Sequence, residues 1–264
     1  MSPTMSFALK LSHPGAWRAA RLSTLLLALG ACLPGAHAGP HWSYDGHHAG
    51  PAEWAHLDPA FEACGIGQAQ SPIDIRNAVT ADLPPLEFHY PDSAATLVNN
   101  GHTVQINLPA GATLKVGDRV FNLLQFHFHT PSEEAINGKH AAMVAHFVHK
   151  DADGKLGVVG LMMNVGPRAN PAFAGVFAHL PREGETITVE GLTLDLAALL
   201  PKDLTYYSYA GSLTTPPCSE GVSWMVLKQP VQVSAQQVAA FRALFRHNAR
   251  PVQPLHGREV LVSH

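Results

Sequence analysis

The sequence Gln125-Phe126-His127-Phe128-His129 ends a run of mostly apolar residues at positions 120–129. In a β-strand, successive side chains point to opposite faces of the sheet. His127 and His129 would therefore project from one face, whereas Phe126 and Phe128 would pack on the other. This pattern is typical of a strand that carries a pair of metal ligands, although two ordinary histidines would show the same spacing.

A third candidate ligand lies in the next apolar run, Val144-Ala145-His146-Phe147-Val148. By the same alternation, His146 shares a face with Val144 and Val148. An Asn137-Gly138 pair between the two runs suits adjacent antiparallel strands. Three imidazoles would then converge from two neighbouring strands. Three neutral ligands leave a zinc ion with its full charge and an open fourth position.

The rest of the chain repeats short apolar runs between Pro- and Gly-containing turns, which predicts a mainly β protein with minor α. Strands are expected at residues 103–108, 120–129, 143–149, 158–165, 186–189 and 222–227. One helix should follow the Asn170-Pro171 cap and extend to about Ala178. A second should begin after Ser234, with Val238, Phe241, Leu244 and Phe245 on its apolar face. No repeat or linker follows residue 40, which indicates a single domain.

The composition excludes several classes of protein. Of the 264 residues, 46% are hydrophobic and 14% are charged, which is unlike a disordered chain. The formal net charge is −3, and no basic stretch is interleaved with aromatic residues, so no nucleic-acid partner is expected. The unusual feature is the count of 17 histidines, which favours a search for metal ligands.

Residues 1–38 have the features of a signal peptide. Arg18 and Arg21 precede an apolar run that is too short for a membrane span, which needs roughly 20 residues. The run ends in Ala36-His37-Ala38, a pattern typical of signal cleavage. The alternative is a lipid anchor on Cys32, in Leu29-Gly30-Ala31-Cys32. Both interpretations place the domain of residues 39–264 outside the cytoplasm, as a periplasmic or secreted protein.

Export affects the interpretation of the cysteines. Cys32 falls within the export segment, which leaves Cys64 and Cys218 in the domain. Two cysteines in an oxidising compartment are expected to form one disulfide. Two buried free thiols are the alternative.

Spacing alone also permits another fold. His127-x-His129-x3-Glu133 matches the core of the cupin motif, which belongs to a β-barrel that binds iron or manganese. The wider cupin pattern has a glycine six residues before the first histidine, where this chain has Phe121. The His-Glu-x-x-His motif of zinc proteases is absent.

Several separated motifs decide between these alternatives. From about His41 to Val260, the sequence resembles the bacterial α-class carbonic anhydrases. The resemblance rests on His41-Trp42-Ser43-Tyr44, Gln70-Ser71-Pro72-Ile73-Asp74-Ile75, Asn99-Asn100-Gly101-His102, Gln125-Phe126-His127-Phe128-His129, Ser132-Glu133, His146-Phe147-Val148-His149, Tyr209-Ala210-Gly211-Ser212-Leu213-Thr214-Thr215-Pro216-Pro217 and Arg250-Pro251-Val252-Gln253-Pro254-Leu255. It implies a large twisted, mostly antiparallel central sheet of about ten strands with short peripheral helices.

The resemblance also implies an activity, the reversible hydration of carbon dioxide to bicarbonate and a proton by attack of zinc-bound hydroxide. Thr214 would orient the hydroxide by a hydrogen bond while donating its own hydrogen to Glu133, and its backbone N–H would receive a substrate oxygen. His102 would carry protons out of the site, since histidine titrates near neutrality. The Zn²⁺ ligands would be His127, His129 and His146.

Further roles follow from the same resemblance. The apolar carbon dioxide pocket would be lined by Val148, Val158, Leu213 and Trp224. Cavity water would be ordered by Tyr44, Asn100, Gln105 and Thr215, the last beside the substrate. Gln125 would orient His127, and the backbone of Asn248 would orient His129. Cys64 and Cys218 match the internal disulfide of the bacterial family.

The expected partners are carbon dioxide and bicarbonate, with sulfonamides and anions as inhibitors and a homodimer as the expected assembly. Two rival functions remain at this stage. A carbonic-anhydrase-like domain that has lost zinc would act only as a binding module, although all three histidines are present here. A cupin-type iron oxygenase is the other rival.

One position departs from the family pattern. Two residues before the third zinc histidine, the family commonly has a glutamate that accepts the second N–H of the ring. Here that residue is Val144, which accepts no hydrogen bond. His146 would then need water, a backbone carbonyl or another side chain, or would leave its donor unpaired at a cost of roughly 1–3 kcal/mol. The sequence therefore predicts an enzyme that loses zinc faster than its relatives do.

Overall fold

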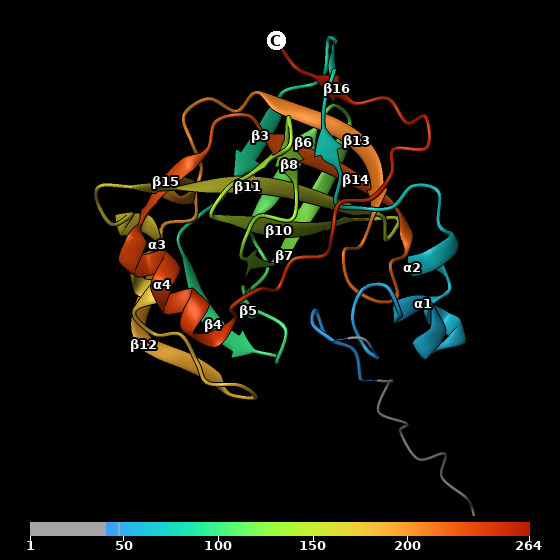
Figure 1. Ribbon diagram of the computed structural model, residues 1–264. Helices are drawn as coiled ribbons and strands as arrows, with labels where there is room; N and C mark the ends of the chain where they lie inside the picture. Colours follow the sequence, from blue (N-terminus) through green and yellow to red (C-terminus); the bar gives the residue numbers. More distant parts are fainter. Residues whose placement is uncertain (1–40, 47) are drawn as a thin grey trace, which may run out of the picture. The chain divides into compact units, whose positions relative to one another are not determined.

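The computed structural model describes residues 41–46 and 48–264 (Figure 1). The predicted signal peptide and the alternative lipid anchor at Cys32 lie outside these residues. Within the described ranges, no helix is long and apolar enough to cross a membrane.

The strands of the described chain form one large sheet of thirteen strands and one small sheet of three. Ten strands of the large sheet follow one another side by side, and most neighbours are antiparallel. Their order is β12 (Thr186–Leu194), β4 (Ser93–Asn99), β5 (Val104–Asn107), β7 (Arg119–His129), β10 (Met143–Asp151), β11 (Leu156–Gly166), β14 (Glu220–Leu227), β13 (Tyr206–Ser212), β16 (Leu261–Val262) and β2 (Val79–Thr80). The predicted mainly β class and the mostly antiparallel central sheet are confirmed. Because the path has two open ends, the cupin barrel is wrong.

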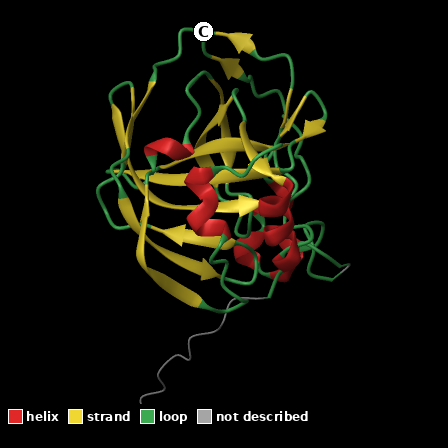
Figure 2. Ribbon diagram, turned by 90° about the vertical axis from the view of Figure 1, so that its left-hand side faces the viewer, coloured by secondary structure: helices red, strands yellow, loops and turns green. Residues whose placement is uncertain are grey.

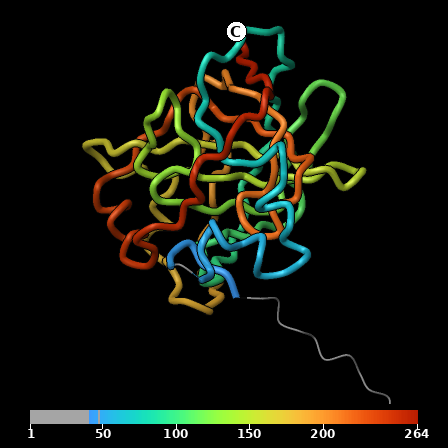
Figure 3. Tube along the Cα trace, turned by 45° about the vertical axis from the view of Figure 1, so that its right-hand side comes forward, coloured from blue at the N-terminus to red at the C-terminus, as the bar shows by residue number. Residues whose placement is uncertain are grey.

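The remaining strands extend this arrangement. β15 (Val231–Ser234) pairs with β11, and β3 (Leu86–His89) pairs with β6 (Thr113–Val116), which joins β7. Three pairs in the large sheet are parallel: β11 with β14, β11 with β15, and β16 with β2. Figure 3 shows the last pair, where the C-terminal segment runs beside the segment near residue 80. The small sheet contains β1 (Asp74–Ile75), β8 (Ala135–Ile136) and β9 (Lys139–His140).

The helices are short and lie around the sheet (Figure 2). They are α1 (Trp54–Leu57), α2 (Ala63–Ile66), α3 (Pro171–Phe177) and α4 (Ala235–Leu244), with 3-10 turns at Pro59–Phe61 and Ala197–Leu199. The Asn170 side chain caps α3 and the Ser234 side chain caps α4, as the sequence predicts, and Gln237 completes a capping box with Ser234. Gln237 also bonds the backbone N–H and C=O of Asn170, which ties the two predicted helices together.

The two faces of β7 and β10 have different surroundings. Phe126, Phe128 and Phe147 are fully buried in the main core on one face. On the other face, Val144 belongs to a second core cluster that includes Val158 and Trp224. The alternation that was predicted from the sequence therefore separates a packed core from the face that carries the histidines.

The turn at Asn137-Gly138 has a different place from the one expected. β7 and β10 are antiparallel neighbours, as predicted, with His146 opposite His127. The two turn residues have φ values of 52° and 78° and close the small hairpin of β8 and β9, which lies between the two long strands in the chain. The left-handed conformation explains the glycine, but the turn does not join the two ligand strands directly.

A candidate metal centre and its cavity

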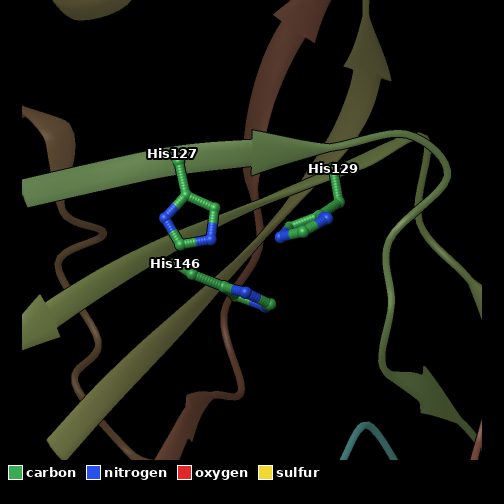
Figure 4. Close-up of side chains that lie close together, drawn as sticks. All are labelled: His127, His129 and His146. Carbon is green, nitrogen blue, oxygen red and sulfur yellow. The ribbon is translucent and has the colours of Figure 1, made fainter. Parts of the chain in front are cut away.

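Three histidines converge on the face of β7 and β10 that lies opposite the buried phenylalanines (Figure 4). His127 and His129 project from β7, and His146 projects from β10 toward the same point. One ring nitrogen from each residue lies within 4.8 Å of those of the other two. The structure thus brings together the three residues that the sequence predicts as ligands.

The outer nitrogen of each ring is fixed by a protein acceptor. His127 Nδ1 donates to Gln125 Oε1 at 2.8 Å, and His129 Nδ1 donates to the backbone oxygen of Asn248 at 2.7 Å. These partners can only accept, so they determine which nitrogen carries hydrogen. The Nε2 atoms of His127 and His129 are left with lone pairs. That of His129 is buried and has no hydrogen-bond partner among the described residues, which fits a metal ion.

His146 is arranged in the opposite sense. Its Nε2 lies 3.0 and 3.2 Å from the two carboxylate oxygens of Glu134, which leaves Nδ1 to face the centre. The expectation that His146 lacks a nearby carboxylate is therefore wrong. Glu134, ten residues before Val144 in the chain, supplies the acceptor that residue 144 does not.

The protonation of the rings also suits metal binding. Burial, followed by the neighbouring His146, lowers the pKa of His127 to about 3 and holds that of His129 well below its usual range. Burial alone would lower the pKa of His146 too, but the Glu134 carboxylate raises it above the usual value. Two rings are therefore neutral, and the third is the most basic ligand.

Glu133 lies behind the histidines and is fully buried. Its Oε1 accepts the backbone N–H of Arg250 at 2.7 Å. Its Oε2 makes no hydrogen bond of normal geometry within the described chain, although the Thr214 hydroxyl is near enough to lower the pKa of the carboxyl. Burial is the largest influence and raises that pKa to about 7. Glu133 is thus held at one oxygen and directed toward Thr214 with the other.

The three histidines line a cavity of about 170 Å³. Most of the predicted site residues line it, and Glu133 and Asn248 lie behind its wall. The lining residues are Trp42, Tyr44, Asn100, His102, Thr103, Gln105, Gln125, His127, His129, His146, Val148, Val158, Leu213, Thr214, Thr215 and Trp224.

His102 is partly exposed in the cavity wall, following β4. Its ring stacks on Trp42 with the ring centres 3.6 Å apart and the planes 8° from parallel. Burial, followed by the nearby His41, lowers its pKa, whereas Glu183 raises it. A partly exposed imidazole that lines the cavity can exchange protons with both cavity and bulk water.

Cys64 and Cys218 form a disulfide, as predicted. The Cys218 backbone N–H donates to Thr215 O at 2.9 Å, so the bond adjoins the loop that carries Thr214. The Arg250 guanidinium donates to Cys64 O at 3.0 Å. The disulfide thus connects α2 to the loop on one side of the cavity.

Sequence reasoning missed four residues of the site: Trp42, Thr103, Glu134 and Arg250. Trp42 and Arg250 stand within motifs that carry the family resemblance, but no role was inferred for them. Glu134 had a usable signal, because a second glutamate follows Glu133 directly in a chain that lacks one at position 144.

Comparison with known proteins agrees with this geometry. The family model described as eukaryotic-type carbonic anhydrase matches residues 49–264. The carbonic anhydrase of Pectobacterium carotovorum is 44% identical over 222 residues, which cover 84% of this chain and 90% of that protein. That of Neisseria gonorrhoeae is 41% identical over 242 residues, which cover 90% and 95%.

Solved structures give the same result. The α-carbonic anhydrase of Thermovibrio ammonificans, in complex with the inhibitor sulfanilamide, superposes with a TM-score of 0.82 at 44% identity and covers 85% of this chain and 100% of that one. The family match spans most of the chain, and the fold and the histidine centre agree with it. The chain therefore belongs to the α-carbonic anhydrase family of enzymes.

Proposed function

We propose that this protein catalyses the zinc-dependent, reversible hydration of carbon dioxide to bicarbonate and a proton. The observation that carries the proposal is the convergence of three imidazole nitrogens within 4.8 Å in a chain of this family. The donor set suits zinc, because three neutral nitrogens are the ligands of a catalytic zinc site with an open position. When bound, zinc acts as a Lewis acid that makes water a nucleophile near neutral pH, for which carbonic anhydrases are the standard example.

Thr214 and Glu133 would orient the attacking oxygen. With Oε1 of Glu133 held by the Arg250 N–H, Oε2 is free to accept the Thr214 hydroxyl hydrogen. Thr214 Oγ1 then has only lone pairs to offer, so it accepts a hydrogen bond from the attacking oxygen and directs that oxygen's own lone pair at carbon. The Thr214 backbone N–H would bind an oxygen of the substrate or of bicarbonate.

The apolar side of the cavity would hold carbon dioxide. Val148, Val158, Leu213 and Trp224 line it beside the histidines. Carbon dioxide has no charge and little polarity, so an apolar wall binds it without a desolvation cost and releases charged bicarbonate.

The proton would leave through water and His102. Tyr44, Asn100, Gln105 and Thr215 line the same cavity as the three histidines and His102, and they would order that water. His102 is partly exposed, so it can receive a proton from the cavity and pass it to buffer.

We further propose export to the periplasm or the medium, which the Cys64–Cys218 disulfide supports. Mass measurement of the purified protein distinguishes cleavage after Ala38 from lipidation of Cys32. Sulfonamides and anions should inhibit, as the sulfanilamide complex of the Thermovibrio ammonificans enzyme suggests. A homodimer stays a prediction, which light scattering of the purified protein would check.

Metal analysis combined with stopped-flow carbon dioxide hydration tests the main proposal. We expect one zinc per chain, hydration that is lost on chelation and regained with zinc, and inhibition by sulfanilamide. A His129→Ala variant should contain little zinc and lack activity. A protein that purifies with iron, or that hydrates carbon dioxide equally well without metal, would contradict the proposal.

A further inference from the structure

We propose that Glu134 is the residue that positions and polarises the metal ligand His146, in the place of a carboxylate at residue 144. This inference rests on the proposed zinc function. In this chain the carboxylate that faces the His146 ring would come from Glu134, in the bend before β8, and not from residue 144 on β10.

The contact between Glu134 and His146 is close and shielded from water. The two carboxylate oxygens lie 3.0 and 3.2 Å from His146 Nε2. Glu134 is 0% exposed and His146 is 1% exposed. A charge-assisted hydrogen bond in such surroundings is stronger than one at a surface, and it makes the other ring nitrogen a better electron donor.

The backbone around Glu134 is fixed by its neighbours. The Ser132 hydroxyl donates to Glu134 O at 2.7 Å and accepts the Ala141 N–H at 2.9 Å. The next residue, Ala135, donates its N–H to the backbone oxygen of Ile73, just before β1, at 3.2 Å. The carboxylate is therefore presented from a rigid bend just before β8, not from the ligand strand itself.

Val144 occupies the place where a second carboxylate would otherwise face the His146 ring. It is fully buried and belongs to the core cluster on the His146 face of β10. Residues 144 and 146 are separated by about 7 Å along the strand, within the reach of a glutamate side chain. A glutamate at both positions would bury two like charges against one ring, which is costly. The valine fills that space with apolar contacts instead.

Zinc release tests the inference directly. The variants are Glu134→Ala, which removes the acceptor, Glu134→Gln, which keeps an acceptor oxygen without the charge, and the exchange variant Glu134→Val/Val144→Glu. The measurement is the rate of zinc transfer from the loaded protein to an excess of a coloured chelator.

We expect Glu134→Ala to weaken zinc binding, and so to speed release, by about 10–100-fold. Glu134→Gln should give a smaller increase, because the amide oxygen still accepts from Nε2. The exchange variant should return release to within a few-fold of the wild-type rate. Recovery in the exchange variant is the result that a merely structural role of Glu134 would not produce.

Tyr90→Phe is the matched control. The Tyr90 hydroxyl lies 2.6 Å from Nε2 of His149, a second buried histidine of β10 that is not a ligand. This control removes the buried hydrogen-bond partner of a histidine that lies on the same strand as His146, and it should leave zinc release unchanged. Circular dichroism and denaturant unfolding of each variant show that the fold is retained.

The inference is overturned if folded Glu134→Ala releases zinc at the wild-type rate. It is also overturned if Tyr90→Phe speeds release as much as Glu134→Ala does, or if the exchange variant stays as fast as Glu134→Ala. These outcomes would leave the proposed function intact, because that function is tested by the zinc content and hydration rate of the wild type. A wild type without zinc would contradict both.

Discussion

At the residue scale, His102 is the side chain that we propose exports the proton. Its ring stacks on Trp42, and it is not one of the three histidines that converge as candidate metal ligands. His102→Ala should therefore lower the hydration rate several-fold in weak buffer while zinc content stays unchanged. Small imidazole buffers should restore part of the rate, since they carry the proton in place of the side chain. Stopped-flow measurements over a series of buffer concentrations check this.

A matched control for that experiment is His56→Ala, because His56 is an exposed histidine that does not line the cavity. It should leave the buffer dependence nearly unchanged. An equal loss of rate at every buffer concentration in His102→Ala would show that another group exports the proton or that the chemical step limits turnover.

The pKa of His102 gives a second prediction. Burial, followed by His41, lowers it from the ordinary value of 6.5, and Glu183 raises it. Its NMR titration midpoint should therefore lie below 6.5, and the side chain should be mostly neutral at neutral pH and ready to accept a proton. His41→Ala should raise the midpoint, and Glu183→Gln should lower it further. A midpoint above 6.5, or shifts of the opposite sign, would contradict this account of its surroundings.

At the scale of elements, the ligand strands were predictable because their signal is local. The alternation in β7 and β10 determines which side chains share a face, and the caps of α3 and α4 mark where those helices begin. β13 was missed because it contains serine, alanine and glycine instead of a β-branched run. Gly211 is needed there, since a Cβ atom would lie 2.2 Å from Ser71 Oγ and 2.7 Å from Trp224.

Contacts across elements were not predictable from periodicity. Alternation does not reveal that β11 has parallel neighbours, nor that the Asn137-Gly138 turn belongs to a separate hairpin. The carboxylate of Glu134 reaches His146 from a bend twelve residues away, so no strand pattern contains that pair. The family resemblance supplied most lining residues of the cavity, but it also led to a wrong expectation where this chain departs from the family.

His149 on β10 gives a prediction about stability. It is fully buried, its Nε2 lies 2.6 Å from the Tyr90 hydroxyl, and its Nδ1 lies 3.3 Å from Gly157 O. Burial lowers its pKa to about 4, whereas the unfolded chain should have a value near 6.5. Between about pH 6.5 and about pH 4, His149 binds a proton in the unfolded state but not in the native state. The free energy of unfolding therefore decreases as the pH falls from about 6.5 toward 4.

The expected loss from this residue between about pH 7 and about pH 5 is up to about 2 kcal/mol. Denaturant unfolding of the wild type and of His149→Gln at both pH values measures it, since glutamine does not titrate. Any effect of zinc loss at low pH is shared by both proteins and cancels in the difference. An identical pH dependence in the two proteins would show that His149 does not contribute.

At the scale of the whole molecule, the site depends on segments that are distant in the chain. The β7 and β10 ligands, the loop of Thr214 and the segment from Asn248 to Arg250 meet around one cavity. Arg250 links them: its backbone holds Glu133, and its buried guanidinium donates to Gln70, Ser71 and Cys64. Because the disulfide joins Cys64 of α2 to Cys218, the geometry of the loop that carries Thr214 is coupled to the packing of α2.

The disulfide provides the test of that coupling. Replacing Cys64 and Cys218 by serine should reduce the free energy of unfolding by about 2–5 kcal/mol, because the bond closes a separation of 154 residues and restricts the unfolded chain. The hydration rate of the folded double variant should stay close to that of the wild type. The reason is that residue 218 keeps its backbone hydrogen bond to Thr215, and Arg250 still donates to the backbone oxygen of residue 64. Denaturant unfolding with and without reductant measures the effect, and reductant should not affect the double variant. Two thiols that react without reduction in the exported wild type would show that the disulfide does not form. A double variant as stable as the oxidised wild type would show that the disulfide does not stabilise the protein.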